Sequence, residues 1–156
     1  MVGNVRDAMQ CTNGVLIGEG CYRKAWLYNA VVYKVLYNSD NTRYGLADEN
    51  QDEVEAVWSV LNEGRLPAHI SVPPVTNYQF DTGELVSVNA MPFIEGRLVG
   101  ECFCSTRELA TDIHKTSCIP QSIVDEINDL TGLLDLGYGN VILDDNGVYH
   151  VIDCQQ

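Results

Sequence analysis

Three oxygen-bearing side chains near the end of the chain have the spacing of a metal-ion site. Two short apolar segments flank the dipeptide Asn146-Gly147, a strong signal for a tight hairpin with positive backbone φ angles. If Asn146 and Gly147 form a two-residue loop, counting outward places Asn140 directly opposite Asp153. Directly opposed residues have Cβ atoms about 5 Å apart. The spacing therefore predicts an amide oxygen and a carboxylate side by side, with Asp135 just upstream.

This set of oxygen atoms has two interpretations. Hard oxygen ligands that close together are typical of a Mg²⁺ site that carries a phosphate substrate. An acidic loop end in an acidic protein would give the same pattern, and the spacing alone does not separate the two. Asp135 follows the apolar pair Leu133-Leu134 and also fits a simple loop after a helix. Its interest comes from its position five residues before Asn140.

Lys34 lies in the middle of an apolar run that is typical of a strand. Burying an ammonium group without a partner is costly, so either Lys34 reaches solvent from an edge strand or an acidic partner lies inside. Glu53 precedes Val57 by four residues and so lies along the apolar stripe of the next predicted helix. Glu55 is followed four residues later by the polar Ser59. We expect Glu53 to be the partner, with Glu55 in reserve; a solvated acidic helix face is the competing interpretation.

The tripeptide Gly18-Glu19-Gly20 separates two predicted strands. Glycines at such a place let the backbone approach a ligand and point its N–H groups at phosphate oxygens. A plain hairpin turn has the same pattern, so Gly18 and Gly20 indicate a phosphate-binding loop only together with other residues.

The elements that must position these side chains follow from the hydrophobic pattern. It predicts strands over residues 15–17, 25–28, 30–37, 75–80, 85–88, 141–143 and 148–152. It predicts helices over residues 50–61, 106–115 and 120–134, with Pro120 in the first turn of the last one. Residues 91–96 fit an extended connector. This order predicts an α+β fold, with a small β-rich lobe joined to a smaller helical lobe at about residue 95.

Composition and charge exclude several function classes. With 156 residues, 46% of them hydrophobic, the chain can bury one core or two small lobes. A net charge of −13 argues against nucleic-acid binding and against anionic membrane surfaces, and it favours approach to basic proteins. The N-terminus does not resemble a signal peptide, and no apolar run is long enough to span a bilayer. We therefore expect a cytoplasmic protein.

The six cysteines do not form a metal-binding pattern. No two of them are spaced as Cys-x-x-Cys, which is the usual unit of a structural zinc site. Without a secretory signal, reduced thiols are the expected state.

Taken in order along the chain, these residues resemble the motifs of the protein kinase superfamily. That family has a glycine-rich loop, a lysine in the third strand and a glutamate in the helix that follows. Gly18 and Gly20 stand where the loop is expected, and Lys34 and Glu53 follow at suitable distances. The resemblance covers about residues 14–153. It implies a bilobal kinase-like fold.

The second half of the chain continues the resemblance. The segment that contains Met91 and Ile94 looks like the hinge that receives an adenine ring. Asp135 and Asn140 reproduce the Asp-x-x-x-x-Asn spacing of the catalytic loop, and Asp153 lies where the metal-binding Asp of the Asp-Phe-Gly motif would. The sequence Gly-Asn-Val-Ile around Asn140 and the short format look most like the small kinases encoded by tailed bacteriophages. The lobes would then be residues 1–94 and a much reduced 95–156.

Several positions depart from the family pattern. Arg23 replaces the third glycine of the loop, and Leu133-Leu134 replaces the His-Arg pair before the catalytic Asp. Cys154 follows Asp153 in place of Phe-Gly, and the sequence ends three residues after Asp153. An activation segment and a peptide-docking platform are therefore not expected, and nucleotide binding is better supported than peptide phosphorylation.

The resemblance implies a role for each residue. Lys34, held by Glu53, would orient the α and β phosphates of ATP. Asn140 and Asp153 would hold Mg²⁺, and Asp135 would accept the proton of an attacking hydroxyl. Phosphoryl transfer depends mostly on positioning and charge neutralisation, so little covalent work is needed from the protein.

The expected function is thus an ATP-dependent phosphotransferase, a minimal serine/threonine protein kinase that uses Mg·ATP on a protein substrate. If a phage encodes it, its place would be the host cytoplasm. The alternative is a non-catalytic kinase-like interaction protein, an acidic inhibitor of a basic host protein. A third interpretation is a small-molecule phosphotransferase of the aminoglycoside-kinase type, which usually needs a larger helical lobe. A second copy of the chain is a further candidate partner.

Overall fold

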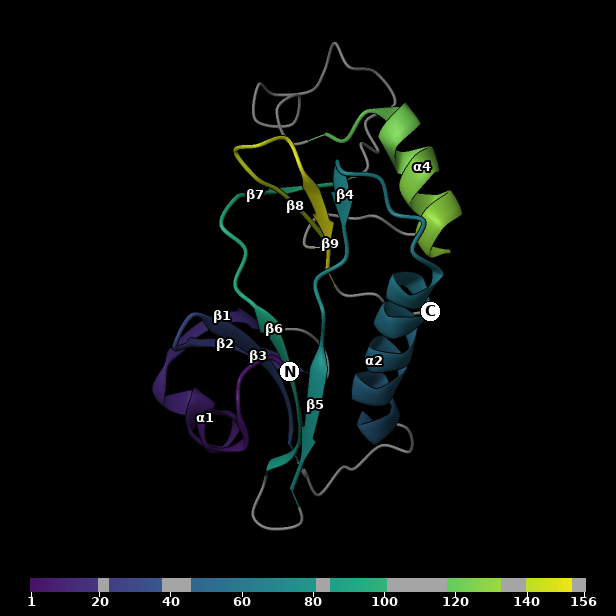
Figure 1. The fold of residues 1–156 in the computed structure, drawn as a ribbon. Helices are drawn as coiled ribbons and strands as arrows, with labels where there is room; N and C mark the ends of the chain where they lie inside the picture. The colour runs from purple at the N-terminus through teal and green to yellow at the C-terminus, as the bar shows by residue number, and fades with distance from the viewer. Residues whose placement is uncertain (20–22, 38–45, 81–84, 101–117, 133–139, 153–156) are drawn as a thin grey trace. The chain divides into compact units, whose positions relative to one another are not determined.

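The computed structural model describes residues 1–19, 23–37, 46–80, 85–100, 118–132 and 140–152 (Figure 1). The fold is α+β, as the sequence predicts. The chain divides into two compact units. The first comprises residues 1–59 and 73–93, and the second comprises residues 60–72 with the described residues from Ile94 onward. Residues 60–72, predicted from the sequence to lie in the first lobe, therefore belong to the second unit.

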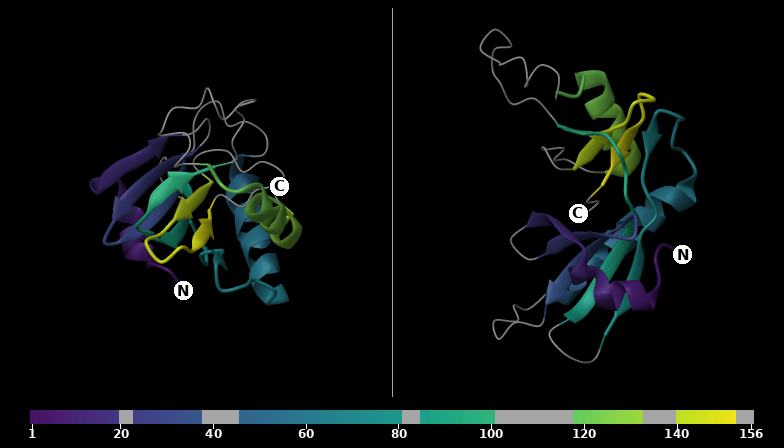
Figure 2. Two further views of the ribbon diagram at one scale, coloured as in Figure 1. Left: turned by 90° about the horizontal axis from the view of Figure 1, so that it is seen from above. Right: turned by 90° about the vertical axis from the view of Figure 1, so that its left-hand side faces the viewer.

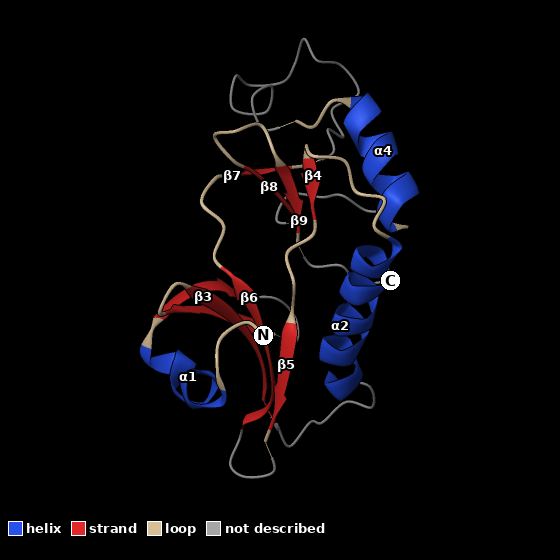
Figure 3. Ribbon diagram, viewed as in Figure 1, coloured by secondary structure: helices blue, strands red, loops and turns tan. Residues whose placement is uncertain are grey.

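The first unit is built on a five-stranded antiparallel sheet (Figure 3). Its order is β1-β2-β3-β6-β5. The strands are β1 Val15–Glu19, β2 Lys24–Tyr28, β3 Val31–Tyr37, β6 Leu85–Pro92 and β5 Thr76–Gln79. The strand β6 continues to Pro92, where it pairs with Val31, so the connector expected from Met91 begins later. The cause is main-chain pairing with β3, which a pattern of side chains does not report.

Alternation along β3 gives the sheet two different faces. Tyr33 and Val35 point to one face and join a buried apolar cluster with Ala8 and Cys11. Lys34 points to the other face, toward the helix α2 Leu46–Glu63. The helix α1 Val5–Gln10 and the short 3-10 helix η1 Cys11–Asn13 cover the first face, so the sheet lies between two helical layers (Figure 1, Figure 2).

The N-terminal layer was not expected from the sequence. Asn4 caps α1, because its side chain accepts a hydrogen bond from the backbone N–H of Asp7 at 2.8 Å. Val2 ties the segment to β5: its N–H donates to Thr76 Oγ1 at 3.0 Å, and its carbonyl accepts from the Tyr78 hydroxyl at 2.8 Å. The layer therefore belongs to the folded unit.

The second unit contains a four-stranded sheet and one described helix. The sheet order is β4-β9-β8-β7, with β4 parallel to β9 and the other pairs antiparallel. The elements are β4 Ile70–Ser71, β7 Arg97–Val99, α4 Gln121–Thr131, β8 Val141–Leu143 and β9 Tyr149–Val151.

The helix α4 is shorter than the expected 120–134. Pro120 is its N-cap rather than a first-turn residue, and Gly132 ends it at φ 73° with its N–H bonded to the carbonyl of Asn128. A glycine in the left-handed region is the usual end of a helix. The helix expected over 106–115 lies outside the described residues.

The turn between β2 and β3 offers a test of backbone strain. Asn29 and Ala30 both have positive φ angles, 49° and 62°, and Ala30 is the costlier of the two because alanine rarely adopts this region. Ala30→Gly should raise the free energy of unfolding by about 1 kcal/mol in urea titrations. The matched change Ala25→Gly, within β2, should lower it, since glycine weakens a strand interior. Equal losses for both variants would contradict the expectation.

Candidate functional site

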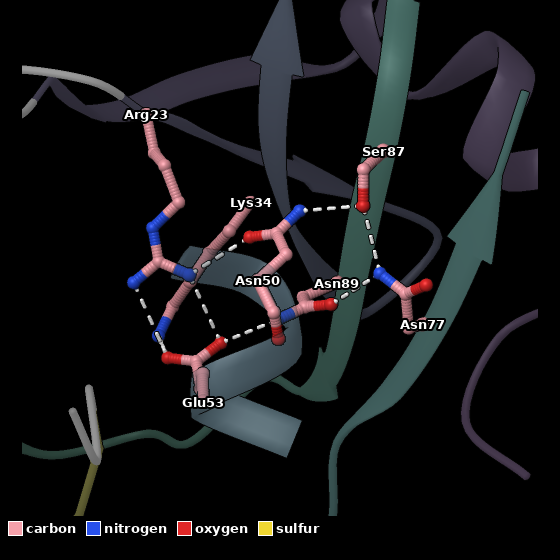
Figure 4. A network of polar contacts seen from close by, with 7 residues as sticks. All are labelled: Arg23, Lys34, Asn50, Glu53, Asn77, Ser87 and Asn89. Carbon is pink, nitrogen blue, oxygen red and sulfur yellow. Dashed lines mark hydrogen bonds and ion pairs between the residues drawn. The ribbon is translucent and has the colours of Figure 1, made fainter. Parts of the chain in front are cut away.

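Lys34 and Glu53 form a buried ion pair between β3 and α2. Lys34 Nζ lies 2.6 Å from Glu53 Oε2, and the two side chains are 9% and 1% exposed (Figure 4). The pairing predicted from the sequence is confirmed, whereas Glu55 is exposed on the same helix. The reason is the helical stripe: Asn50, Glu53 and Val57 recur at three- and four-residue spacing, and all are buried.

A second cation shares the Glu53 carboxylate. Arg23, which directly precedes β2, lies with Nη1 3.2 Å from Oε1 and Nη2 3.3 Å from Oε2. Its side chain is 10% exposed. In the sequence, Arg23 is only a departure from the glycine-loop pattern, and nothing in that pattern predicts its position beside Glu53. The carboxylate therefore lies between an ammonium and a guanidinium group.

Around this triad the side chains form a closed ring of hydrogen bonds. On one side, Asn89 donates to Glu53 Oε1 at 2.9 Å and accepts from Asn77 at 2.8 Å. On the other side, Arg23 donates to Asn50 Oδ1 at 2.9 Å. Ser87 Oγ closes the ring by accepting from both Asn50 and Asn77. The network in Figure 4 draws on three strands, the helix α2 and the residue just before β2. Its members are Lys34 of β3, Asn77 of β5, Ser87 and Asn89 of β6, Asn50 and Glu53 of α2, and Arg23.

The two charged members fix the orientation of every amide in the ring. A guanidinium can only donate, so Asn50 must present its oxygen to Arg23 and its NH₂ group to Ser87. An ionised carboxylate can only accept, so Asn89 must present its NH₂ group to Glu53. Satisfied buried networks of this kind hold their members in one arrangement. The position of Glu53 is therefore determined by the sheet as well as by its own helix.

The surrounding charges keep Glu53 ionised. Burial raises the pKa of its carboxyl, but the nearby Lys34 and Arg23, with hydrogen bonds from Lys34 and Asn89, lower it further, from 4.5 to about 2. Glu53 therefore carries its negative charge at neutral pH.

The glycine-loop positions are only partly within the described chain. Gly18 lies in β1, next to a register irregularity between Leu16 and Gly18, and Gly20 lies outside the described residues. A Cβ added at Gly18 would be 3.7 Å from that of Ala25, an ordinary contact. Local packing therefore does not require glycine at position 18. Bulges of this type occur often beside active sites.

The two hinge candidates occupy different surroundings. Met91 is buried in β6, opposite Val32 of β3, and belongs to the first unit. Ile94 is half-buried and belongs to the second unit. Between them, the N–H of Phe93 donates to the carbonyl of Ala30 at 3.2 Å, which fixes the chain where β6 ends.

The predicted register of the C-terminal hairpin is wrong by one residue. Asn140 faces Ile152, whose N–H donates to the Asn140 carbonyl at 2.8 Å, and not Asp153. The loop has three residues instead of two, and it ends at Gly147 with φ 80°. The cause is Asp144, which remains in the ladder opposite Val148.

Asp144 holds this loop through both of its carboxylate oxygens. Its Oδ1 accepts from the backbone N–H groups of Asn146 and Val148, each at 2.9 Å, while Oδ2 lies 2.8 Å from His150 Nε2. These bonds, with the one to His150 foremost, lower the pKa of Asp144. A side chain that bonds backbone N–H groups ahead of it is typical of an Asx turn.

The other predicted residues of this region are only partly placed. Asn140 is half-buried immediately before β8, while Asp135 and Asp153 lie outside the described residues. Within the described ranges, no three His, Cys, Asp or Glu side chains gather as they would around a metal ion.

In the same part of the chain, no helix has both the length and the apolar character needed to cross a membrane.

Comparison with known proteins adds no relative. No protein-family model matches the sequence, and a search of curated proteins finds no significant match.

Proposed function

We propose that this protein is an ATP-dependent phosphotransferase, a serine/threonine protein kinase of reduced size that uses Mg·ATP. The observation that carries the proposal is the buried pair of Lys34 in β3 and Glu53 in α2. A lysine in the third strand paired with a glutamate in the following helix is the kinase arrangement for binding the α and β phosphates. A bilobal kinase-like arrangement of the whole chain is part of this proposal.

The donor chemistry of the proposed site fits a magnesium nucleotide. Asn140 and Asp153, which are not directly opposite each other in the hairpin, would supply hard oxygen ligands, which Mg²⁺ prefers. Bound Mg·ATP would supply the phosphoryl group to be transferred, with its charge partly neutralised by the metal. Glu53 would orient the Lys34 ammonium toward the phosphates. Asp135 would accept the proton of the attacking hydroxyl. The segment with Met91 and Ile94 would receive the adenine ring.

The first experiment asks whether the protein binds the nucleotide. Saturating Mg·ATP should raise the melting temperature by about 5 °C or more, since a ligand at a hundred times its Kd stabilises by about 3 kcal/mol. Asp153→Ala should melt at the unmodified temperature without ligand and lose most of this shift. Glu55→Ala, an exposed change on α2, should keep it. Transfer of labelled phosphate should fall with the shift in Asp153→Ala; transfer that persists would remove the role given to Asp153.

The net charge of −13 favours a second candidate, a non-catalytic kinase-like protein that binds a basic partner. This candidate predicts no melting shift with Mg·ATP. It predicts instead an association whose rate falls steeply with added salt. The melting experiment therefore separates the two functions in one measurement.

A further inference from the structure

The arrangement of donors around Glu53 points to a role for Arg23. We propose that Arg23 is a positioning residue that neutralises the charge of the Glu53 carboxylate when Lys34 moves away from it. The Lys34 ammonium can then turn to an anionic ligand. The identity of that ligand, the phosphates of Mg·ATP, rests on the proposed function. The holding of Glu53 by Arg23 does not.

The two carboxylate oxygens receive their donors unequally. Oε1 accepts from Arg23 Nη1 at 3.2 Å and from Asn89 Nδ2 at 2.9 Å. Oε2 accepts from Lys34 Nζ at 2.6 Å and from Arg23 Nη2 at 3.3 Å. With Lys34 drawn away, both oxygens keep a donor from Arg23. With Arg23 gone, Oε1 keeps only a neutral amide. Arg23 is thus the member that reaches both oxygens.

The chemistry of the two cations suits this division of roles. A guanidinium is a planar fork that is held by several bonds at once, whereas a lysine ammonium is a compact charge on a flexible stem. The fork of Arg23 is fixed from a second side by Asn50 Oδ1, at 2.9 Å, and Asn50 is itself fully buried and bonded to Ser87. Arg23 is therefore anchored independently of Lys34.

A simple buried pair would behave differently. When one partner of a buried ion pair is removed, the other is left as an uncompensated charge, and stability falls steeply. In a one-lysine, one-glutamate clamp, each movement of the lysine toward a ligand would carry part of that cost. Here Arg23 and Asn89 still donate hydrogen bonds to Glu53 when Lys34 leaves, so that the movement of Lys34 to a ligand costs less stability.

The test is a double-mutant cycle in urea at pH 7 with Lys34→Met, Arg23→Met and the double variant. Each single variant keeps one cation on Glu53, and only the double variant has neither. We expect the unfolding equilibrium constant of the double variant to exceed the product of the two single effects by about tenfold. The proposal would be overturned if the effect of the double variant on the unfolding equilibrium constant equalled the product of the two single effects. It would also be overturned if adding Arg23→Met to Lys34→Met caused no further loss of stability.

Two controls isolate the carboxylate and the location. In a Glu53→Gln background, the excess should fall well below tenfold, because no anion remains to be compensated and only the repulsion between the two cations couples them. A second cycle combines Lys34→Met with Arg65→Met in place of Arg23→Met. Its two effects should be independent, because Arg65 pairs with Glu63 at the surface, where both side chains are about half exposed. A tenfold excess that survives either control would overturn the assignment to Glu53.

A spectroscopic measurement serves if the double variant does not fold. The carboxyl ¹³C signal of Glu53 should show an ionised group at pH 7 in Lys34→Met, because Arg23 still compensates it. A protonated Glu53 at that pH would overturn the proposal. In Arg23→Met the carboxyl should titrate at a higher pH than in the unmodified protein, and Arg23→Lys should restore part of the difference.

Binding of Mg·ATP, measured on the same variants, separates this inference from the proposed function. No binding together with the tenfold excess would overturn the proposed function and support the role of Arg23. Binding together with simply multiplying effects would overturn the role of Arg23 and support the function.

Discussion

Glu53→Ala is expected to lower the free energy of unfolding by about 3–5 kcal/mol, because it removes the anion that two buried cations share. The side chain is 1% exposed and accepts bonds from Lys34, Arg23 and Asn89. Its loss also opens the ring of hydrogen bonds, so that Asn89 no longer has its acceptor. Urea unfolding at pH 7, followed by tryptophan fluorescence, would measure the change.

The matched control is Glu55→Ala, which lies two residues away on the same helix and is exposed. It removes the same chemical group, with the same change in helix propensity, outside the network. We expect its effect to stay within about 0.5 kcal/mol. Similar losses for Glu53→Ala and Glu55→Ala would mean that the helix, and not the buried carboxylate, determines stability.

The pair of Lys34 and Glu53 could be predicted because two periodicities are visible in the sequence. Lys34 interrupts an apolar strand, and Glu53 occupies the apolar stripe of a helix. Both interruptions would be costly unless they met, and that physical requirement chose Glu53 over Glu55. The strands β2, β3 and β8 could be predicted because their sequences are runs of β-branched, aromatic and other apolar residues, which favour a strand.

The polar ring was missed although a signal for it exists. In β6, Ser87 and Asn89 alternate with the apolar Val88 and Ala90. Antiparallel pairing places Asn89 beside Lys34 and on the same face. Polar residues on the face of a buried lysine indicate a buried network, but the inference needs the strand register. Arg23 had no such signal, because its position depends on the path of the chain into β2.

The hairpin shows why loop length could not be read from the dipeptide alone. Asn-Gly is compatible both with a two-residue loop and with the last two positions of a three-residue loop. The choice was made by Asp144, whose side chain accepts from two backbone N–H groups of the loop. A one-residue change of register moves every following side chain to the opposite face. The candidate metal site was therefore the part of the prediction most sensitive to this error.

Acid is expected to remove the stabilisation that Glu53 provides. Burial raises the pKa of Glu53, but the charges of Lys34 and Arg23, together with the hydrogen bonds from Lys34 and Asn89, lower it further, to about 2 in the folded protein against 4.5 ordinarily. A folded-state pKa that is lowered contributes stability above the unfolded value. That stability is lost as the pH falls through the folded value. The shift corresponds to about 3 kcal/mol, present at pH 5 and above and lost progressively between about pH 4.5 and pH 2.

Glu53→Gln isolates this contribution, because a glutamine has nearly the shape of a protonated glutamate. The free energies of unfolding of the unmodified protein and of Glu53→Gln, measured in urea from pH 7 to pH 2, should differ most at neutral pH. The difference should shrink as the pH falls below about 4.5, because the unmodified protein then acquires the same neutral group. Glu55→Gln should follow the unmodified protein at each pH, because its side chain is exposed. A difference between Glu53→Gln and the unmodified protein that is constant over the whole range would show that the amide acts through its shape or hydrogen bonding, and not through the missing charge.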